Sequence, residues 1–210
     1  MFKIYAMGVS ERKLREKEQL KELILNAARE LFFKQGYEKT SIRNIAENIE
    51  YSPGIIYHYF KDKNEIFHTL HTEGFSALKK KMTSVSAIAD PMSRLKAMGK
   101  LYIQFAIENP IIYDLMFMLK APVEHMISEE VEGWEEGESI FTLLKHTVRD
   151  AIVQGYFRGL SVEPLTYMIL ATLHGLVSLK IRKRTNRIKV TEQEQIVMNS
   201  YQAFTMLLDR

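Results

Sequence analysis

Three side chains with polar-tipped rings stand in a row at Tyr57, His58 and Tyr59. Tyrosine and histidine offer hydrogen-bond donors, acceptors and apolar edges, a combination that suits base edges, thymine methyl groups and phosphate oxygens. A buried helix has little use for three such rings in succession, and an exposed helix normally avoids them. The triplet therefore predicts a surface that contacts double-stranded DNA.

Side chains that can reach a phosphate backbone surround this triplet. Arg43 comes before the rings, and Lys61 and Lys63 follow them. Gly54 lets the backbone come close to a phosphate because no Cβ atom intervenes. Lysine and arginine neutralise phosphate charge, although these three cations are also consistent with an ordinary solvated surface. The predicted DNA-binding residues are Thr40, Ser41, Arg43, Ser52, Pro53, Gly54, Tyr57, His58, Tyr59, Lys61 and Lys63.

The rings need a short helix with one face toward a core and the other toward solvent. Such a helix is predicted over 53–59, because a serine followed by a proline supplies an N-cap and a suitable first helical residue. Ile56 and Phe60 lie four residues apart on it. Both would pack inward on Ile45 and Ala46, which turns the ring-bearing face outward.

Two earlier helices complete this unit. Residues 10–35 carry apolar residues at the spacing of one buried stripe, and Gly36 suits the left-handed residue that follows a helix. Thr40 and Ser41 offer an N-cap for a short helix over about 41–49. Three helices of these lengths, the last two joined by a short turn, are typical of a helix-turn-helix unit, whose second helix enters the major groove of DNA.

The rest of the chain also has helical periodicity, and no stretch alternates convincingly with the period of a strand. Capping patterns open helices at Asp62 and at Asp90, and Thr191 with Glu194 forms a last capping box. The acidic stretch at 123–138 predicts a solvated loop or a broken helix, because its like charges repel. The helices expected after the first three span about 62–86, 91–109, 110–118, 138–154, 164–181 and 192–208.

These patterns predict an all-α fold of roughly nine helices. We expect a helix-turn-helix DNA-binding domain over 10–62 and a helical ligand-binding and dimerisation domain over 63–210. The sequence shows no internal repeat and no low-complexity linker, so the boundary is expected within continuous helical packing.

Composition narrows the classes of function. The 210 residues are 46% hydrophobic and include no cysteine, which excludes disulfides and fits a cytoplasmic protein. The net charge of +3 neither demands nor opposes an anionic partner. The longest apolar stretch, at 167–179, is shorter than a membrane span, so we expect no membrane partner.

The sequence shows no pattern of a metal site or a catalytic site. The spacing of a helical metal site is absent from Glu65, His68 and His71, and no nucleophile has an orienting partner. We therefore expect no metal, no cofactor and no enzymatic activity.

The N-terminal part resembles the DNA-binding domain of TetR-family transcriptional regulators. The similar stretch, about residues 20–67, contains AARELFFKQGYEKTSIRNIAENIEYSPGIIYHYFKDKNEIF. The resemblance combines many positions, namely Gly36-Tyr37, Thr40-Ser41-x-Arg43-x-Ile45-Ala46, Ser52-x-Gly54 and Tyr57-His58-Tyr59-Phe60 followed by Lys61-x-Lys63. Residues 105–117 and 171–179 are similar to the ligand-binding domain of one subgroup of the family.

Two positions depart from the family pattern. Glu50 stands in the turn of the helix-turn-helix unit, where the family usually has glycine. Either Glu50 adopts the left-handed conformation under strain, or the turn is built differently. Leu173 precedes His174-Gly175 where the subgroup has tryptophan, which weakens the second resemblance.

The resemblance implies a homodimer that binds a palindromic operator and a small-molecule effector. By position, the helices near 164–181 and 192–208 would pair with those of a second copy. A hydrophobic effector would release the operator, although the sequence specifies neither the effector nor the operator, nor repression against activation. Each side chain of the implied ligand pocket is equally consistent with a plain core, and these residues are Tyr102, Phe105, Tyr113, Phe117, Phe141 and His174.

The alternative function is a helical adaptor or enzyme that uses the three-helix unit only as a scaffold. An enzyme would need convergent nucleophile, acid or metal groups, and an adaptor would not need exposed Gly54, Tyr57 and His58 beside several cations. Binding of upstream DNA that weakens steeply with salt would distinguish the regulator from both.

Overall fold

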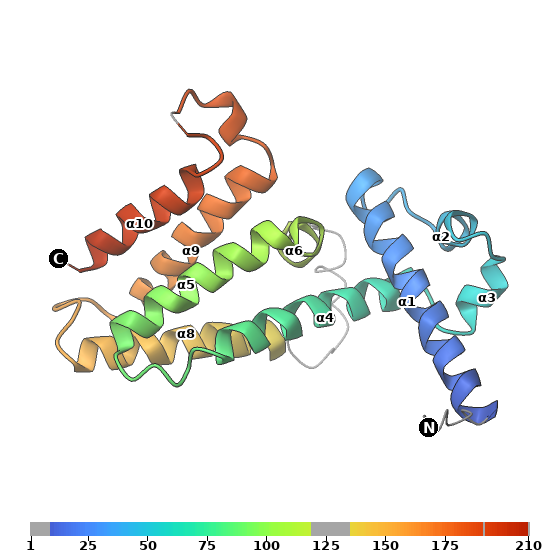
Figure 1. The fold of residues 1–210 in the computed structure, drawn as a ribbon, viewed down its shortest axis with the longest axis horizontal. Helices are drawn as coiled ribbons and strands as arrows, with labels where there is room; N and C mark the ends of the chain where they lie inside the picture. Colours follow the sequence, from blue (N-terminus) through green and yellow to red (C-terminus); the bar gives the residue numbers. More distant parts are fainter. Residues whose placement is uncertain (1–8, 119–134, 191, 210) are drawn as a thin grey trace, which may run out of the picture. The chain divides into compact units, whose positions relative to one another are not determined.

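The computed structural model describes residues 9–118, 135–190 and 192–209, and every regular element in these ranges is helical (Figure 1). This confirms the predicted all-α fold. Most of the acidic stretch at 123–138 lies outside the described residues. The elements are α1 (Val9–Gln35), α2 (Ile42–Asn48), α3 (Pro53–Tyr57), α4 (Lys63–Thr83), α5 (Pro91–Glu108), α6 (Pro110–Phe117), α8 (Glu135–Val153), α9 (Val162–Ile181), the 3₁₀ turn η1 (Thr185–Arg187) and α10 (Ile196–Leu208).

The chain divides into two compact units. The first comprises Met1–His71 and Leu115–Glu130, and the second comprises Thr72–Asp114 and Val131–Arg210. Helix α4 therefore begins in the first unit and ends in the second. The domain boundary expected at residue 62 stays a prediction.

The first unit has a core between α1, α2, α3 and the start of α4. Leu25 and Phe32 of α1 and Ile45 of α2 are buried in it. The ring of Phe32 packs against Tyr37 and Phe67, with centroid separations of 5.3 and 6.1 Å. These contacts hold the short helices α2 and α3, which are too short to be stable alone.

Side-chain caps fix where the helices of this unit begin. The Ser41 hydroxyl accepts the backbone N–H of Asn44 at 3.1 Å, and the Asn44 side chain accepts the N–H of Ser41 at 3.0 Å. Before α4, the Asp62 carboxylate accepts the N–H of Glu65 at 2.9 Å. The Glu65 carboxylate reaches back to the N–H of Lys61 at 2.5 Å, one residue earlier than a regular capping box. The start of α4 predicted at Asp62 is confirmed.

Glu50 occupies the left-handed region, with φ of 60°. Its backbone N–H donates to the Glu47 carbonyl, and the N–H of Tyr51 returns to the Ala46 carbonyl at 2.9 Å. These bonds close the turn between α2 and α3. Of the two alternatives for this turn, the first is confirmed: a non-glycine residue bears the positive φ.

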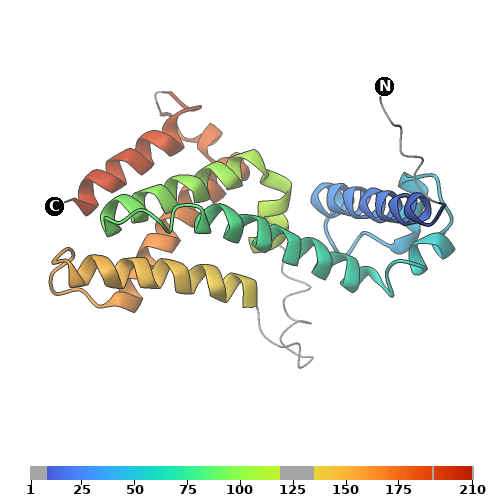
Figure 2. The ribbon, with the colours of Figure 1, turned by 60° about the horizontal axis from the view of Figure 1, so that its bottom comes forward.

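The second unit is a helical bundle (Figures 1 and 2). Helix α5 packs against α8, α9 and α10, while α9 packs against α8 and α10. Gly99 of α5 allows the closest approach, because a Cβ atom there would lie 2.7 Å from the Tyr201 hydroxyl oxygen of α10. The Tyr201 hydroxyl donates to the Lys96 carbonyl, so the ring is held where the glycine leaves room.

Three helix starts differ from the expectations. Helix α8 begins at Glu135, before the expected 138, and α9 begins at Val162 with Ser161 as its N-cap. The last helix begins only at Ile196, with Gln195 as N-cap and no side-chain capping bond, because Glu192 has φ of 60°. A helix cannot continue through a left-handed residue, so the helix start expected at 192 is wrong, while Thr191 of the expected capping box lies outside the described residues.

Gly99→Ala is expected to destabilise the protein by about 1–3 kcal/mol, because the added methyl group overlaps the Tyr201 ring. Urea unfolding of the variant and the wild type measures the loss. In a Tyr201→Leu background the same substitution should be neutral or slightly stabilising, since alanine favours the helix. An equal loss in both backgrounds would contradict the packing described.

Glu50→Gly is expected to stabilise the protein by about 0.5–1 kcal/mol, because glycine relieves the positive φ but loses more backbone entropy on folding. Glu50→Ala is the matched control, since it removes the same carboxylate and keeps the strain. Thermal unfolding of both variants measures the difference. Equal melting temperatures for the two variants would show that the turn carries no strain.

Candidate nucleic-acid interface and buried polar cluster

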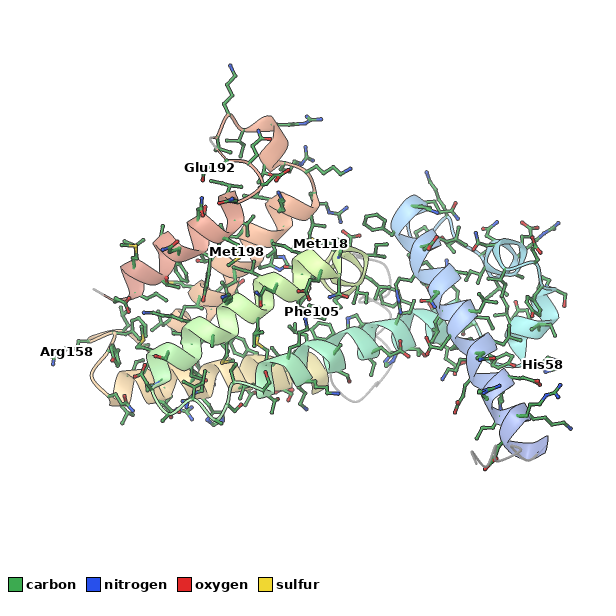
Figure 3. The ribbon with its side chains drawn as sticks, viewed as in Figure 1. His58, Phe105, Met118, Arg158, Glu192 and Met198 are labelled. Carbon is green, nitrogen blue, oxygen red and sulfur yellow. The ribbon has the colours of Figure 1, made fainter. Side chains whose placement is uncertain are left out.

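The face of α3 that bears the rings is turned away from the core. Ile56 is fully buried, as is Phe60 just after the helix, whereas Tyr57 is 58% exposed. His58, which follows α3 directly, is also exposed (Figure 3). Pro53, Gly54 and Ser52 at the start of the helix are exposed too. The predicted orientation of the two faces is confirmed.

Tyr59 lies between the two faces. Its side chain is partly buried and packs against the core of the first unit. It therefore has less surface to offer a ligand than Tyr57 or His58.

The hydroxyl of Thr40 lies inside the fold, and its expected place on the surface is wrong. Thr40 is only 2% exposed, and its hydroxyl donates to the Gly36 carbonyl at 2.8 Å. It also accepts the side-chain N–H of Gln35 at 3.3 Å. Ser41 is exposed, and its hydroxyl caps α2 through Asn44. The two neighbouring hydroxyls thus have different roles that their sequence positions do not distinguish.

Arg43 and Lys61 are the predicted phosphate-binding cations with the most exposed side chains. Arg43 is largely exposed and pairs with Glu47 one turn later at 2.8 Å. An exposed pair of this kind contributes only about 0.3–0.5 kcal/mol, so a phosphate can displace the carboxylate. Lys61 is exposed at the turn before α4.

Lys63 is bound to the fold itself. Its ammonium donates to the Tyr37 carbonyl at 2.9 Å and lies 4.0 Å from the centroid of the Tyr37 ring. Burial lowers the pKa of Lys63, with Glu38 opposing that shift. The Tyr37 hydroxyl in turn donates to Asn64, and burial raises the pKa of Tyr37 to about 12. Lys63 therefore fastens the start of α4 to the turn after α1, and a phosphate contact from it stays a prediction.

Three of the expected ligand residues form a buried polar cluster in the second unit. Tyr113 of α6 lies with its hydroxyl oxygen 2.6 Å from Nδ1 of His174 on α9. Tyr102 of α5 lies 3.0 Å from the Tyr113 hydroxyl oxygen and 3.3 Å from the same imidazole nitrogen. Which atom donates in these contacts depends on the imidazole tautomer, and either tautomer joins the three side chains in one hydrogen-bonded network.

Burial fixes the protonation of this cluster near neutral pH. It raises the pKa of Tyr102 and of Tyr113, because a phenolate would lose its water. It lowers the pKa of His174 for the same reason, since the charged imidazolium is disfavoured. All three side chains are therefore neutral at pH 7.

The other three expected ligand residues, Phe105, Phe117 and Phe141, are not among the contacts of the polar cluster described above. Phe105 is buried on α5, three residues after Tyr102 (Figure 3), and Phe141 is partly buried on α8. Phe117 belongs to the first unit, together with Leu115. The structure thus brings Tyr102, Tyr113 and His174 into contact and assigns Phe117 elsewhere.

An ion pair between a buried carboxylate and a half-exposed guanidinium stands beside the cluster, and sequence reasoning did not predict it. Asp114, next to Tyr113, is 4% exposed, and its carboxylate lies 2.6 Å from the guanidinium of Arg182 after α9. Burial raises the pKa of Asp114, and Arg182 opposes the shift. The available signal was a single acidic residue inside the apolar run PIIYDLMF.

The helices α9 and α10 turn apolar side chains to the surface. Tyr167 and Met168 of α9 are 68% and 64% exposed, and Met206 and Leu207 of α10 are similarly exposed. Among the described residues α9 alone is long and apolar enough to cross a membrane, and 28% of its apolar window is buried. The apolar stretch at 167–179 lies within this helix of 20 residues, and the expectation of no membrane partner stays a prediction. An apolar face of this size marks an interaction surface.

Comparison with known proteins identifies both parts of the chain. Residues 24–70 match the model of bacterial regulatory proteins of the tetR family, and residues 95–200 match that of the tetracyclin repressor-like C-terminal domain. The TetC protein of transposon Tn10 from Escherichia coli is 26% identical over 133 residues, 62% of this chain and 63% of that protein. The regulator HbdR of Aromatoleum is 35% identical over 79 residues, 37% of this chain and 34% of that protein. The chain thus matches less than two thirds of the length of these relatives.

Solved structures share the fold. The fatty acid degradation regulator FadR of Bacillus halodurans superposes with a TM-score of 0.69 at 20% identity, covering 87% of this chain and 92% of that one. AibR in complex with isovaleryl coenzyme A and operator DNA also gives 0.69 at 20% identity, covering 86% and 95%. Since the second family match alone spans just over half of the 210 residues, the chain belongs to the TetR family of bacterial regulatory proteins.

Proposed function

We propose that this protein is a ligand-responsive, sequence-specific DNA-binding transcriptional regulator, acting as a repressor that a small hydrophobic effector releases from its operator. The observation that carries the proposal is the two-sided packing of α3. Ile56 is buried in the core, while Tyr57 and His58 remain exposed. This exposure supports binding rather than catalysis, and the proposed DNA binding implies a site of action in the cytoplasm. No observation favours the adaptor or enzyme alternative.

On the DNA side, α3 enters the major groove. Tyr57 and His58 face base edges, and the exposed start of the helix at Gly54 approaches the backbone. Arg43 and Lys61 bind phosphates, with Ser41 close to the start of α2. The remaining members of this set are Ser52, Pro53, Tyr59 and Lys63.

The proposed assembly is a homodimer through α9 and α10. The exposed apolar side chains of Tyr167, Met168, Met206 and Leu207 supply a surface that a second copy would cover. A two-fold dimer presents two α3 helices to a palindromic operator, whose half-sites lie about 34–36 Å apart. Such pairing would also bury the exposed apolar side chains of α9 without a membrane.

The effector would bind in the second unit at the buried polar cluster. Tyr102, Tyr113 and His174 offer hydroxyl and imidazole groups, while Phe105 and Phe141 add apolar surface. This combination suits a mainly apolar molecule that carries one hydrogen-bonding group. The AibR structure with isovaleryl coenzyme A and operator DNA supports the proposal that a protein of this fold can bind both a small molecule and DNA.

Release follows if effector binding and DNA binding favour different conformations of the dimer. Couplings of this kind amount to about 1–3 kcal/mol, enough to weaken operator binding several-fold to a hundredfold. Helix α4 runs from the first unit into the second, and α6 also spans both units, so α4 is a continuous element able to transmit the change.

Tyr57→Ala is expected to weaken binding to the protein's own upstream DNA about tenfold while leaving binding to random DNA nearly unchanged, because its ring reads base edges. Lys61→Ala should weaken both alike and reduce the salt dependence, because a lysine contacts phosphate. Fluorescence anisotropy with labelled duplexes at several salt concentrations measures both. Lys61 is preferred to Lys63, whose loss would also disturb the Tyr37 contact.

The opposite pattern, with Lys61→Ala selective and Tyr57→Ala not, would mean that the reading face is misassigned. Equal wild-type affinity for upstream and random DNA would contradict the proposed function itself.

The polar cluster predicts a pH-dependent contribution to stability. Because the pKa of His174 is lowered in the folded state, the folded chain takes up a proton there less readily than the unfolded chain. The contribution of His174 to the free energy of unfolding is therefore full above the ordinary histidine pKa of about 6.5, and it decreases as the pH falls below that value. His174→Gln keeps an acceptor for Tyr113 and does not titrate. The stability of the wild type relative to this variant should therefore be lower at pH 5 than at pH 8, as measured by urea unfolding. A difference independent of pH would show that His174 has no lowered pKa.

A further inference from the structure

A cavity lies among the C-terminal half of α9, the turn η1 and the start of α10. Its volume is about 100 Å³. Glu192, labelled in Figure 3, belongs to the connection between η1 and α10 and lies two residues after Val190, one of the residues that line the cavity. The cavity is lined by Leu176, Leu179, Thr185, Ile188, Val190, Ile196, Val197 and Ser200.

Thr185 gives this cavity a polar group without a partner. The residue is 7% exposed, and its Oγ1 atom makes no hydrogen bond. A buried hydroxyl left unpaired costs about 1–3 kcal/mol, so native proteins rarely keep one without a reason. The hydroxyl lies in the wall of an otherwise mainly apolar cavity, where an entering molecule can satisfy it.

The composition of the wall decides what kind of molecule fits. A buried water molecule typically makes about three hydrogen bonds, whereas only two of the eight lining side chains, Thr185 and Ser200, are polar, so the wall favours a mainly apolar occupant. An aliphatic side chain from a second copy would fill the volume but leave the Thr185 hydroxyl unpaired. A cavity somewhat larger than this one, lined by apolar side chains, holds a molecule of the size of benzene.

The cavity is separate from the polar cluster proposed for the effector. His174 and Leu176 are two residues apart on α9, and successive residues turn by about 100° around a helix. Their side chains therefore leave α9 in nearly opposite directions. His174 contacts α5 and α6 through the two tyrosines, whereas Leu176 faces η1 and α10.

We propose that this cavity is a second small-molecule site, which takes a short molecule with an apolar body and one oxygen, such as a four-carbon alcohol or ketone. The oxygen pairs with the Thr185 hydroxyl, and the carbon atoms contact Leu176, Ile196 and Val197. The site goes beyond the proposed regulator function, since it requires neither DNA nor the effector cluster.

The test is a titration of methyl-labelled full-length protein with isobutanol and, separately, with xenon, followed by NMR. Both probes should produce saturable shifts of the Leu176, Ile196 and Val197 methyl signals, with millimolar affinity because such small ligands make few contacts. Thr185→Val should weaken isobutanol binding about two- to tenfold, the effect of one neutral hydrogen bond, and leave xenon binding unchanged.

Two further variants make the result decisive. Thr172→Val is the matched control, because that hydroxyl already donates to the Met168 carbonyl at 2.8 Å, and it should leave both probes unaffected. Ser200→Leu places a larger side chain in the cavity from its partly exposed side and should abolish the binding of both probes. The proposal is overturned if neither probe shifts these methyl signals saturably, or if Thr185→Val binds isobutanol as the wild type does. Methyl shifts that follow protein concentration but not the probes would instead show that a second copy occupies the cavity, which also overturns it.

Discussion

The proposed function depends on one packing constraint, the burial of Ile56 and Phe60 against the core of the first unit. A helix of five residues has no stability of its own, so α3 exists only because these side chains hold it. With that side fixed, the helical geometry leaves Tyr57 and His58 no direction but outward. The turn before α3 costs free energy, because Glu50, a non-glycine residue, has a positive φ there.

The second unit combines two features that a plain helical bundle would not need. Tyr102, Tyr113 and His174 bring three polar tips together among apolar side chains, where they contact one another within hydrogen-bonding distance. On the outside, α9 and α10 expose large apolar side chains that a lone copy in water would have to leave uncovered. The first feature suits the recognition of a small molecule, and the second suits pairing with another copy. Both features fit a regulator that binds a small molecule and pairs with a second copy of itself.

Much of this could be predicted from the sequence, because helix periodicity, caps and the inward spacing of Ile56 and Phe60 are local properties. Some failures arise from contacts between residues distant in the sequence, and others from local turns that the sequence does not mark. Thr40 and Ser41 are both hydroxyl residues before a helix, and only the fold shows that Thr40 turns inward to Gly36. The hydrogen bond from the Lys63 ammonium to the Tyr37 carbonyl, 26 residues away, was not predicted, and a phosphate contact from Lys63 stays a prediction. Asp114 finds Arg182 across an even longer stretch, and the late start of α10 follows from a left-handed residue that no local pattern marked.

The central claim, that the outward ring of α3 meets DNA, is tested most directly by ¹⁹F NMR of protein carrying 3-fluorotyrosine at position 57 alone. On addition of a duplex from the upstream region, the signal should shift and lose its sensitivity to the exchange of H₂O for D₂O, because the groove excludes solvent from the ring. The same label at position 37, which is buried in the core, should show little change. If the protein binds the duplex while the position 57 signal keeps its shift and its solvent sensitivity, DNA contacts another surface and the account is wrong.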